Sequence, residues 1–395
     1  MPSNLFHRST STAVIQALDE IFNGDRYADK VIEKILKQNP KWGSRDRRFI
    51  AETTYNIVRW YRLLEELAGS KDPWKIFAAW MHLQRVELPP WSEFSSVKFD
   101  GWKEKLHDAQ SIRKIRESIP DWMDALGEKE LGSLWEKEIH ALNEEAKVVL
   151  RANTLRIQRN DLRKVLAKED VATETLSINK DALALSQRQN VFQLNSFKEG
   201  LFEVQDGGSQ LIAPFLEVEP GMRVVDACAG AGGKTLHLAA LMQNKGRILA
   251  MDTEEWKLEE LKKRARRSGA ANIETRTIES SKTIKRLGES ADRLLLDVPC
   301  SGLGVLKRNP DAKWKLSEEF INRIRDTQQQ IISSYSKMLK PGGLMVYSTC
   351  SLLPSENEEQ VKTFLQGGGF DLVEEKKVMP SEGFDGFYMA RLRRS

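Results

Sequence analysis

The chain has 395 residues, and because domains most often contain about 100–150 residues we expect two or three domains. Its apolar residues (40%) are interrupted by charged ones (30%), and no run approaches the ~20 apolar residues that a membrane helix needs. The first residues also lack the basic and apolar regions of a signal peptide, so we expect a soluble, cytoplasmic protein. The net charge of +4 permits nucleic-acid binding without requiring it.

The cysteine content argues against both a disulfide framework and a metal site. The chain has three cysteines, Cys228, Cys300 and Cys350, all in its C-terminal half. No pair of them has the spacing of metal ligands, and the five histidines are scattered. We therefore expect free thiols and no bound metal.

The composition changes along the chain. Eight of the ten tryptophans precede residue 136, whereas glycine-rich turns concentrate after residue 200. In the first part apolar residues recur at helical spacing, as at Val14, Leu18 and Ile21, which predicts an all-α N-terminal domain over residues 1–140. We interpret its tryptophans as core residues rather than base-stacking platforms, because they lie among these apolar positions.

After residue 140 the residue pattern changes and predicts a small α+β subdomain over residues 141–200. Residues 148–154 suit a strand, Asn160 is placed to cap a helix, and residues 171–178 suit another strand. The remaining residues, 201–395, predict one large α/β domain.

That domain begins with a strand, a glycine turn and a helix. Residues 222–227 predict a buried strand, and Cys228-Ala-Gly-Ala-Gly-Gly-Lys-Thr235 leads from it into an apolar helix. Gly230, Gly232 and Gly233 let the backbone turn sharply and approach a ligand, with helix amides directed at its negative group. The turn is not a P-loop, because a cysteine stands where that motif requires glycine, and the dinucleotide fingerprint also fails.

The next strand predicts the cofactor. Residues 247–252 form a strand that ends in Asp252, from which a carboxylate can bind both hydroxyls of a ribose. We favour this role over that of an exposed acid at a helix start. A ribose-bearing cofactor without pyrophosphate indicates S-adenosylmethionine. A third strand, residues 273–278, ends near Glu279, which we expect to contact the adenine.

Two later strands each end near a cysteine. Residues 292–297 run into Val-Pro-Cys300, and residues 344–348 run into Thr-Cys350. Consecutive strands of such sheets are usually neighbours about 4.8 Å apart, and ligands bind at their carboxyl ends, so we expect the two thiols to share one pocket. One free cysteine is more often inert than reactive, but two at matched positions favour chemistry.

Methylation at C5 of a pyrimidine is the chemistry that needs these thiols. C5 is too weak a nucleophile to attack a sulfonium methyl unaided, and addition of a thiolate at C6 activates it. Asp297 is placed to hydrogen-bond near N3 and to stabilise the charge that develops in the ring. After methyl transfer a base removes the C5 proton and the thiol is eliminated.

Four stretches resemble the RsmB/Nop/Sun RNA cytosine-5 methyltransferases, over roughly residues 145–395. They are Asp226–Thr235, Asp297–Gly304 with Arg308–Asp311 and Trp314, Ser348–Asn357, and Asp385–Tyr388. The resemblance implies a Rossmann-like S-adenosylmethionine-dependent methyltransferase domain preceded by a small RNA-recognition-like subdomain. The helical segment that begins at Ser44 resembles the NusB-like RNA-binding domain of bacterial small-subunit rRNA enzymes.

The resemblance also implies roles for individual residues. Cys350, in the Thr-Cys-Ser motif, matches the family's nucleophile, and Cys300, in the Pro-Cys-Ser motif, matches the cysteine that assists product release. DNA cytosine-5 methyltransferases use the Pro-Cys cysteine as nucleophile, which makes Cys300 the rival assignment. We place Asp297 and Lys234 with the two cysteines as catalytic residues.

Cofactor contacts are implied for the glycine loop and three acids. They are Cys228, Ala229, Gly230, Ala231, Gly232, Gly233 and Lys234 in the loop, and Asp252, Glu279 and Asp297 at strand ends. Ala231 stands where the family usually has proline, and Glu279 where it usually has aspartate. These departures are expected to change cofactor affinity rather than chemistry.

We therefore expect an enzyme that methylates C5 of a cytosine in RNA, with base flipping delivering the cytosine. The NusB-like segment favours 16S rRNA as substrate, with tRNA as the alternative. A DNA substrate is disfavoured, because no large target-recognition region follows the Pro-Cys motif. A non-catalytic RNA-binding ribosome assembly factor is the other alternative, although such a protein would typically have lost a cysteine or a loop glycine.

Overall fold

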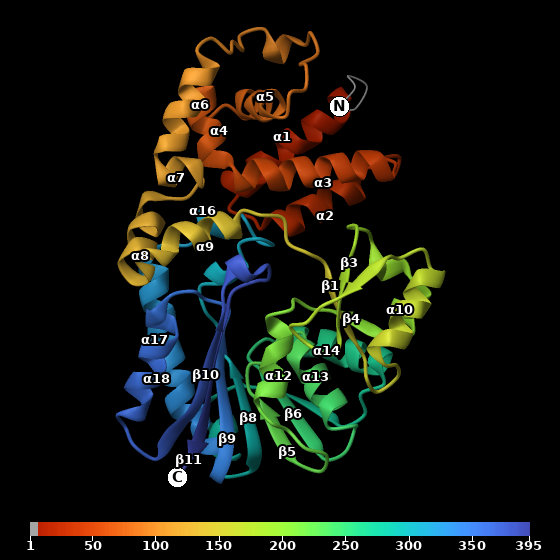
Figure 1. Ribbon diagram of the computed structural model, residues 1–395, viewed down its shortest axis with the longest axis vertical. Helices are drawn as coiled ribbons and strands as arrows, with labels where there is room; N and C mark the ends of the chain where they lie inside the picture. The colour runs from red at the N-terminus through yellow and green to blue at the C-terminus, as the bar shows by residue number, and fades with distance from the viewer. Residues whose placement is uncertain (1–6) are drawn as a thin grey trace. The chain divides into compact units, whose positions relative to one another are not determined.

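The computed structural model describes residues 7–395, with the elements labelled in Figure 1. The expectation about a signal peptide concerns the first residues and lies outside this range. The chain divides into two compact units. One contains the residues up to Glu144 together with Leu306–Glu318, and the other contains Glu145–Val305 together with Glu319–Ser395. The finer boundaries at residues 140 and 200 remain predictions.

The first unit is built from helices, as the spacing of its apolar residues predicts. They are α1 (Arg8–Phe22), α2 (Ala28–Gln38), α3 (Ser44–Arg59), α4 (Tyr61–Ala68), α5 (Pro73–Leu83), α6 (Trp102–Ser111), α7 (Arg113–Arg116), α8 (Asp121–Leu131), α9 (Leu134–Leu142) and α16 (Ala312–Lys315). Six of the tryptophans before residue 136 pack against its main apolar cluster, and Trp135 is itself buried. The interpretation of these seven as core residues is confirmed.

The segment Leu306–Glu318, which follows the Pro-Cys-Ser motif in sequence, packs into this helical unit. Trp314 Nε1 donates a hydrogen bond to the carbonyl oxygen of Val58 at 2.8 Å. The carboxylate of Asp311 accepts one from the backbone N–H of Ala28 at 2.9 Å. Both side chains belong to the family-like motifs, and these contacts give them a packing role within the unit.

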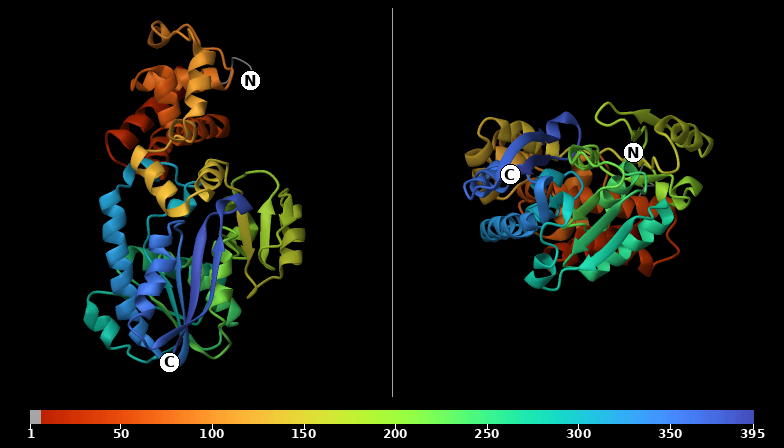
Figure 2. Two further views of the ribbon diagram at one scale, coloured as in Figure 1. Left: turned by 60° about the vertical axis from the view of Figure 1, so that its left-hand side comes forward. Right: turned by 90° about the horizontal axis from the view of Figure 1, so that it is seen from below.

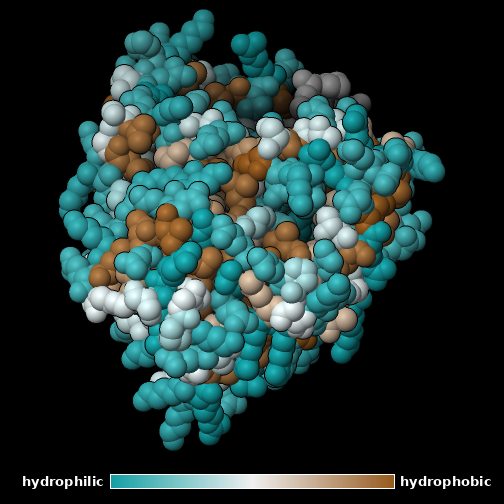
Figure 3. Space-filling view, turned by 60° about the horizontal axis from the view of Figure 1, so that its bottom comes forward, coloured by the Kyte–Doolittle hydropathy of each residue, from teal (hydrophilic) through white to brown (hydrophobic). Residues whose placement is uncertain are grey.

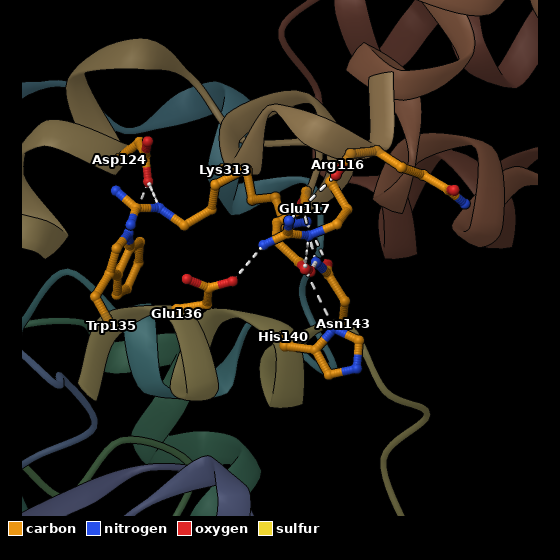
Figure 4. A network of polar contacts seen from close by, with 10 residues as sticks. Arg116, Glu117, Asp124, Trp135, Glu136, His140, Asn143 and Lys313 are labelled. Atoms are coloured by element: carbon orange, nitrogen blue, oxygen red, sulfur yellow. Dashed lines mark hydrogen bonds and ion pairs between the residues drawn. The ribbon is translucent and has the colours of Figure 1, made fainter. Parts of the chain in front are cut away.

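Lys313 of α16 is fully buried and belongs to the polar network shown in Figure 4. Its Nζ donates to Oδ1 of Asn143 at 2.5 Å. It also donates to three backbone carbonyl oxygens, those of Arg59, Glu117 and Ser118, at 3.2, 3.3 and 3.3 Å. Arg59 ends α3, Glu117 and Ser118 follow α7, and Asn143 follows α9, so one side chain connects three parts of the unit to the inserted segment.

We predict that Lys313→Met lowers the free energy of unfolding by about 1–3 kcal/mol, the cost typical of leaving buried acceptors without a hydrogen-bond donor. Methionine leaves the three carbonyl oxygens and the Asn143 amide without their shared donor. Thermal unfolding should be compared with that of Lys105→Met, whose side chain is exposed on α6. Equal melting temperatures for the two variants would show that the network contributes nothing measurable.

The second unit starts with a four-stranded antiparallel sheet of order β2-β3-β1-β4. Its elements are β1 (Val149–Ala152), α10 (Arg159–Lys168), β2 (Thr173–Thr175), β3 (Ala182–Leu185) and β4 (Phe202–Val204). The cap predicted at Asn160 is wrong, because α10 begins at Arg159 and Gln158 takes the cap position with an extended backbone. The strand predicted over residues 171–178 forms only as β2, because the chain then turns to pair with β3.

The rest of this unit is a seven-stranded sheet of order β10-β11-β9-β8-β5-β6-β7. Its strands are β5 (Arg223–Asp226), β6 (Arg247–Asp252), β7 (Ile273–Thr277), β8 (Ala291–Asp297), β9 (Leu339–Thr349), β10 (Phe370–Val378) and β11 (Phe387–Arg394). β7, β6, β5, β8 and β9 are parallel, whereas β11 and β10 pair antiparallel. The chain reverses its direction of travel between β5 and β8, the place where sheets of this kind bind ligands.

Helices cover both faces of the large sheet (Figures 1 and 2). They include α12 (Ile212–Phe215), α13 (Gly233–Leu241), α14 (Glu255–Ser268), α17 (Glu318–Tyr335) and α18 (Glu358–Leu365). Successive residues of one strand enter different clusters, since Leu294 and Leu296 pack on the face with α17 whereas Leu295 packs on the face with α13. This burial on both faces explains the nearly continuous apolar runs of the parallel strands.

No helix between residues 7 and 395 is long and apolar enough to cross a bilayer. On the face shown in Figure 3, hydrophilic side chains predominate and apolar residues gather only in small groups.

Candidate active site

The two cysteines that follow β8 and β9 lie in contact. The strands pair in parallel with Asp297 opposite Ser348, so the loops after them leave the sheet together. Sγ of Cys300 lies 3.3 Å from Sγ of Cys350, and both residues are half-buried. The expected proximity of the two thiols is confirmed, while their separate roles remain predictions.

The surroundings of Cys300 favour its protonated form. The hydrogen bond with Cys350 and burial raise the pKa of the Cys300 thiol well above its usual range, and the charge of Glu356 adds to this effect. Cys300 therefore keeps its proton near neutral pH and can act as a hydrogen-bond donor to Cys350.

Asp297, at the end of β8, is held from two sides. Its Oδ2 accepts a hydrogen bond from Nζ of Lys234 at 2.6 Å, and its Oδ1 accepts one from Oγ of Ser348 at 3.0 Å. Burial alone would lower the pKa of Lys234, but the charge and hydrogen bond of Asp297 outweigh it and the pKa is raised. A charged ammonium and a carboxylate thus face each other beside the two thiols.

A cavity of about 600 Å³ lies at the switch point of the sheet. Its lining includes Ala227, Cys228, Gly230, Asp252, Thr253, Glu254, Ile278, Ile284, Asp297, Pro299, Ile331 and Tyr335. Asp297 and Pro299 belong to the same loop region as Cys300, so the cavity reaches from the glycine loop to the neighbourhood of the thiols.

This lining fits a nucleoside-containing cofactor. The carboxylate of Asp252 accepts hydrogen bonds from the backbone N–H groups of Gly230 and Glu254, at 2.9 and 3.0 Å, which fixes it at the cavity with lone pairs to spare for ribose hydroxyls. Isoleucine and tyrosine side chains supply an apolar surface for a base. Glu279 is exposed and does not line the cavity, so its contact with adenine remains a prediction.

The glycine loop has a shape that requires glycine at Gly232. Its φ is +87°, and an added Cβ would lie 2.5 Å from Cγ of Leu261 on α14. The remaining loop residues named above as cofactor contacts run from the end of β5 into α13. Of this loop, Cys228 and Gly230 line the cavity.

Two arginines, the buried Arg151 and the half-buried Arg264, hold the glycine loop. Nη1 of Arg264 donates to the carbonyl oxygen of Ala231 at 2.8 Å, and Nη1 of Arg151 donates to that of Gly233 at 3.0 Å. Glu203 of β4, only 2% exposed, accepts a hydrogen bond from Arg264 at 2.9 Å and is also paired with Arg267. Residues of the small sheet thereby support the glycine loop directly.

Sequence reasoning missed these supporting residues. The available signal was a charged residue inside each of two apolar strands, Arg151 in β1 and Glu203 in β4, since such residues are rarely buried unless they are paired. Their partners could not be identified, because they lie far away in the sequence.

Together the strand order, the cavity at the switch point and the acid at the end of β6 define an S-adenosylmethionine-dependent methyltransferase with a Rossmann-like sheet.

Comparisons with known proteins identify the family. Residues 213–393 match the family model for 16S rRNA methyltransferase RsmB/F, and residues 119–192 match that for the ferredoxin-like domain of RsmF/B-like methyltransferases. The chain is 31% identical over 389 residues to the probable ribosomal RNA small subunit methyltransferase B of Synechocystis sp., covering 88% of this chain and 87% of that protein. It is 33% identical over 315 residues to ribosomal RNA small subunit methyltransferase B of Pasteurella multocida, covering 75% and 67%.

A solved structure of a methyltransferase homolog has a similar fold. The methyltransferase homolog protein from Pyrococcus horikoshii superposes with a TM-score of 0.65 at 27% identity, covering 73% of this chain and 99% of that one. The chain therefore belongs to the RsmB/F methyltransferase family, whose members use S-adenosylmethionine to methylate RNA.

We predict that Glu203→Gln weakens S-adenosylmethionine binding about tenfold, which corresponds to ~1.4 kcal/mol. Glutamine removes the charge that holds Arg264, so the carbonyl oxygen of Ala231 loses a rigid donor. Isothermal titration with S-adenosylmethionine measures the effect. Glu174→Gln, exposed in β2, is the matched control, and equal affinities for both variants would contradict the supporting role.

The stability of the fold should depend on pH through Asp226, which lies at the end of β5. This residue is 1% exposed, and its carboxyl group accepts a hydrogen bond from Oγ1 of Thr235 at 2.7 Å. Burial raises its pKa from 3.8 to about 7. Between these values the folded state holds a proton that the unfolded state has released, so stability falls as pH rises, by at most ~1.4 kcal/mol per pH unit.

Asp226→Asn should remove this contribution. Denaturant unfolding at pH 5 and at pH 7.5 measures it, and the wild-type chain should lose more stability between these values than the variant does. The other titrating groups contribute equally to the pH dependence of stability in both proteins, so their contributions cancel in the comparison. Identical changes in the two proteins would show that Asp226 is ionised throughout this range.

Proposed function

We propose that this enzyme transfers a methyl group to C5 of a cytosine in ribosomal RNA through a covalent bond between Cys350 Sγ and C6. The 3.3 Å contact of the two thiols, beside the Lys234–Asp297 pair, is the observation that carries the proposal. S-adenosylmethionine supplies the methyl group as a sulfonium. Cys228–Lys234, Asp252, Glu279 and Asp297 are the proposed cofactor contacts.

The proposed reaction begins at Cys350. Its thiolate adds to C6, which makes C5 nucleophilic enough to take the methyl group, and the sulfonium carbon–sulfur bond breaks as the C5–methyl bond forms. The ammonium of Lys234, held by Asp297, offsets the negative charge that develops at the N3 edge of the ring. A base then removes the C5 proton, the C5–C6 double bond re-forms and the C6–sulfur bond breaks.

Cys300 is proposed to act in this last step. Its pKa is raised, so it holds a proton in contact with Cys350 Sγ. A hydrogen bond from this thiol stabilises the Cys350 thiolate as it leaves C6 and so assists release. The reverse assignment, with Cys300 as nucleophile, would require attack by a thiol whose pKa is raised well above its usual range.

We expect Cys350→Ala to lower methyl transfer on the order of 10³-fold or more, because the reaction loses its nucleophile. Cys300→Ala is expected to form the covalent RNA adduct but to release it slowly, so that a protein–RNA band survives denaturing electrophoresis. Labelled S-adenosylmethionine and RNA are the substrates. An adduct in Cys350→Ala, and none in Cys300→Ala, would exchange the two roles.

The names of the relatives support ribosomal RNA of the small subunit as substrate. Total RNA from a host that lacks the gene should be incubated with the enzyme and examined by bisulfite sequencing. One newly protected cytosine in 16S rRNA is the expected result. Protection only in tRNA would favour the tRNA alternative, and RNA binding without transfer to any RNA would favour an assembly factor.

A further inference from the structure

We propose that Glu356 is a positioning residue that sets the contact between the two active-site thiols, an inference that rests on the proposed function. Glu356 ends a short 3-10 helix, Pro354–Glu356, and is fully buried. It belongs to the motif that starts at Ser348, but it is not among the residues proposed above to contact the RNA or S-adenosylmethionine.

The carboxylate of Glu356 joins the two cysteine loops. Its Oε1 accepts hydrogen bonds from Oγ of Ser301 and from Oγ of Ser351, both at 2.5 Å. Ser301 follows Cys300 and Ser351 follows Cys350 in the sequence. One oxygen atom therefore anchors the residue next to each thiol.

The other oxygen fixes the peptide of Cys300. Oε2 accepts a hydrogen bond from the backbone N–H of Ser301 at 2.8 Å and one from Nε2 of Gln328 at 2.9 Å. Nε2 of Gln328, on α17, also donates to the carbonyl oxygen of Pro299 at 3.0 Å. The backbone is thus held on both sides of Cys300.

The loops are also packed too closely for independent movement. The backbone N–H of Gly304 donates to the carbonyl oxygen of Cys350 at 2.8 Å. A Cβ added at Gly304 would lie 2.7 Å from that oxygen and 2.3 Å from the carbonyl oxygen of Gly386. Only glycine permits this approach, so the hydrogen bonds of Glu356 act on two loops that already touch.

Glu356 is itself fixed by the sheet. Oη of Tyr347, a fully buried residue of β9, donates to the carbonyl oxygen of Glu356 at 2.8 Å. This hydrogen bond ties the backbone of Glu356 to a strand inside the sheet. Because a buried carboxylate must be satisfied by donors, few other arrangements of the two serines are open to the loops. The expected consequence is a fixed distance between the thiols, whereas cofactor binding does not depend on Glu356.

The first test is Glu356→Gln, which keeps the volume but replaces one carboxylate oxygen with an N–H₂ group, so that the four donors lose their shared charged acceptor. Since a misplacement of about 1 Å can cost ~10²-fold in rate, we expect kcat to fall about 10- to 100-fold. The Kd for S-adenosylmethionine and the KM for RNA should stay within about twofold of wild type, because the variant leaves binding surfaces intact. Glu359→Gln, on the exposed side of α18, is the matched control.

A second measurement reports the thiol contact without methylation. A mild disulfide oxidant takes two electrons and two protons from Cys300 and Cys350 as their sulfur–sulfur bond forms, and mass spectrometry of the linked peptides follows its rate. We expect this rate to fall at least about fivefold in Glu356→Gln, because loosened loops hold the thiols in contact for less time. The control variant should match wild type.

Ser351→Ala provides a milder variant in case Glu356→Gln does not fold. It removes one donor on the Cys350 side, and an intermediate loss in both measurements is expected. Wild-type oxidation and turnover rates in folded Glu356→Gln, or in Ser351→Ala if the former does not fold, would overturn the inference. If wild type forms no 5-methylcytosine at all, the proposed function fails, and the oxidation rates still decide whether Glu356 sets the thiol contact.

Discussion

The parallel pairing of β8 with β9 is the constraint on which the site depends. Asp297 lies opposite Ser348 across this pair, so the Pro-Cys-Ser and Thr-Cys-Ser loops start from the same edge of the sheet. A shift of one residue in either strand would turn its side chains to the opposite face and separate the two thiols. The apolar residues that precede each loop pack on both faces of the sheet and hold that register.

Buried polar side chains hold the loops that follow the strands. The loops after β5, β8 and β9 have no ladder of hydrogen bonds of their own, and a charged residue supports them in each case. Glu203, through Arg264, holds the glycine loop, and Glu356 accepts hydrogen bonds from the serines of both cysteine loops. Such groups are costly unless every donor and acceptor is satisfied, which makes them selective for one arrangement rather than simply stabilising.

Local patterns explain what could be predicted. Asp252, Cys300 and Cys350 were identifiable because each stands at or just beyond the end of an apolar run, and the carboxyl ends of parallel strands meet at one edge. The helical spacing around Val14 predicted the α-helices of the first unit for a similar reason. The cap at Asn160 failed because neighbouring polar residues compete for that position and only the backbone geometry chooses between them.

The sequence by itself determined the class of fold and the placing of the two cysteines at neighbouring strand ends, because these depend on periodicity and on residue types at short spacing. Only the tertiary structure decided that Lys234 pairs with Asp297, that Leu306–Glu318 packs among the N-terminal helices, and that Glu356 joins the two loops. These contacts link residues that lie between five and more than two hundred positions apart. Nothing in a local pattern specifies such partners, since they are selected by the packing of the whole chain.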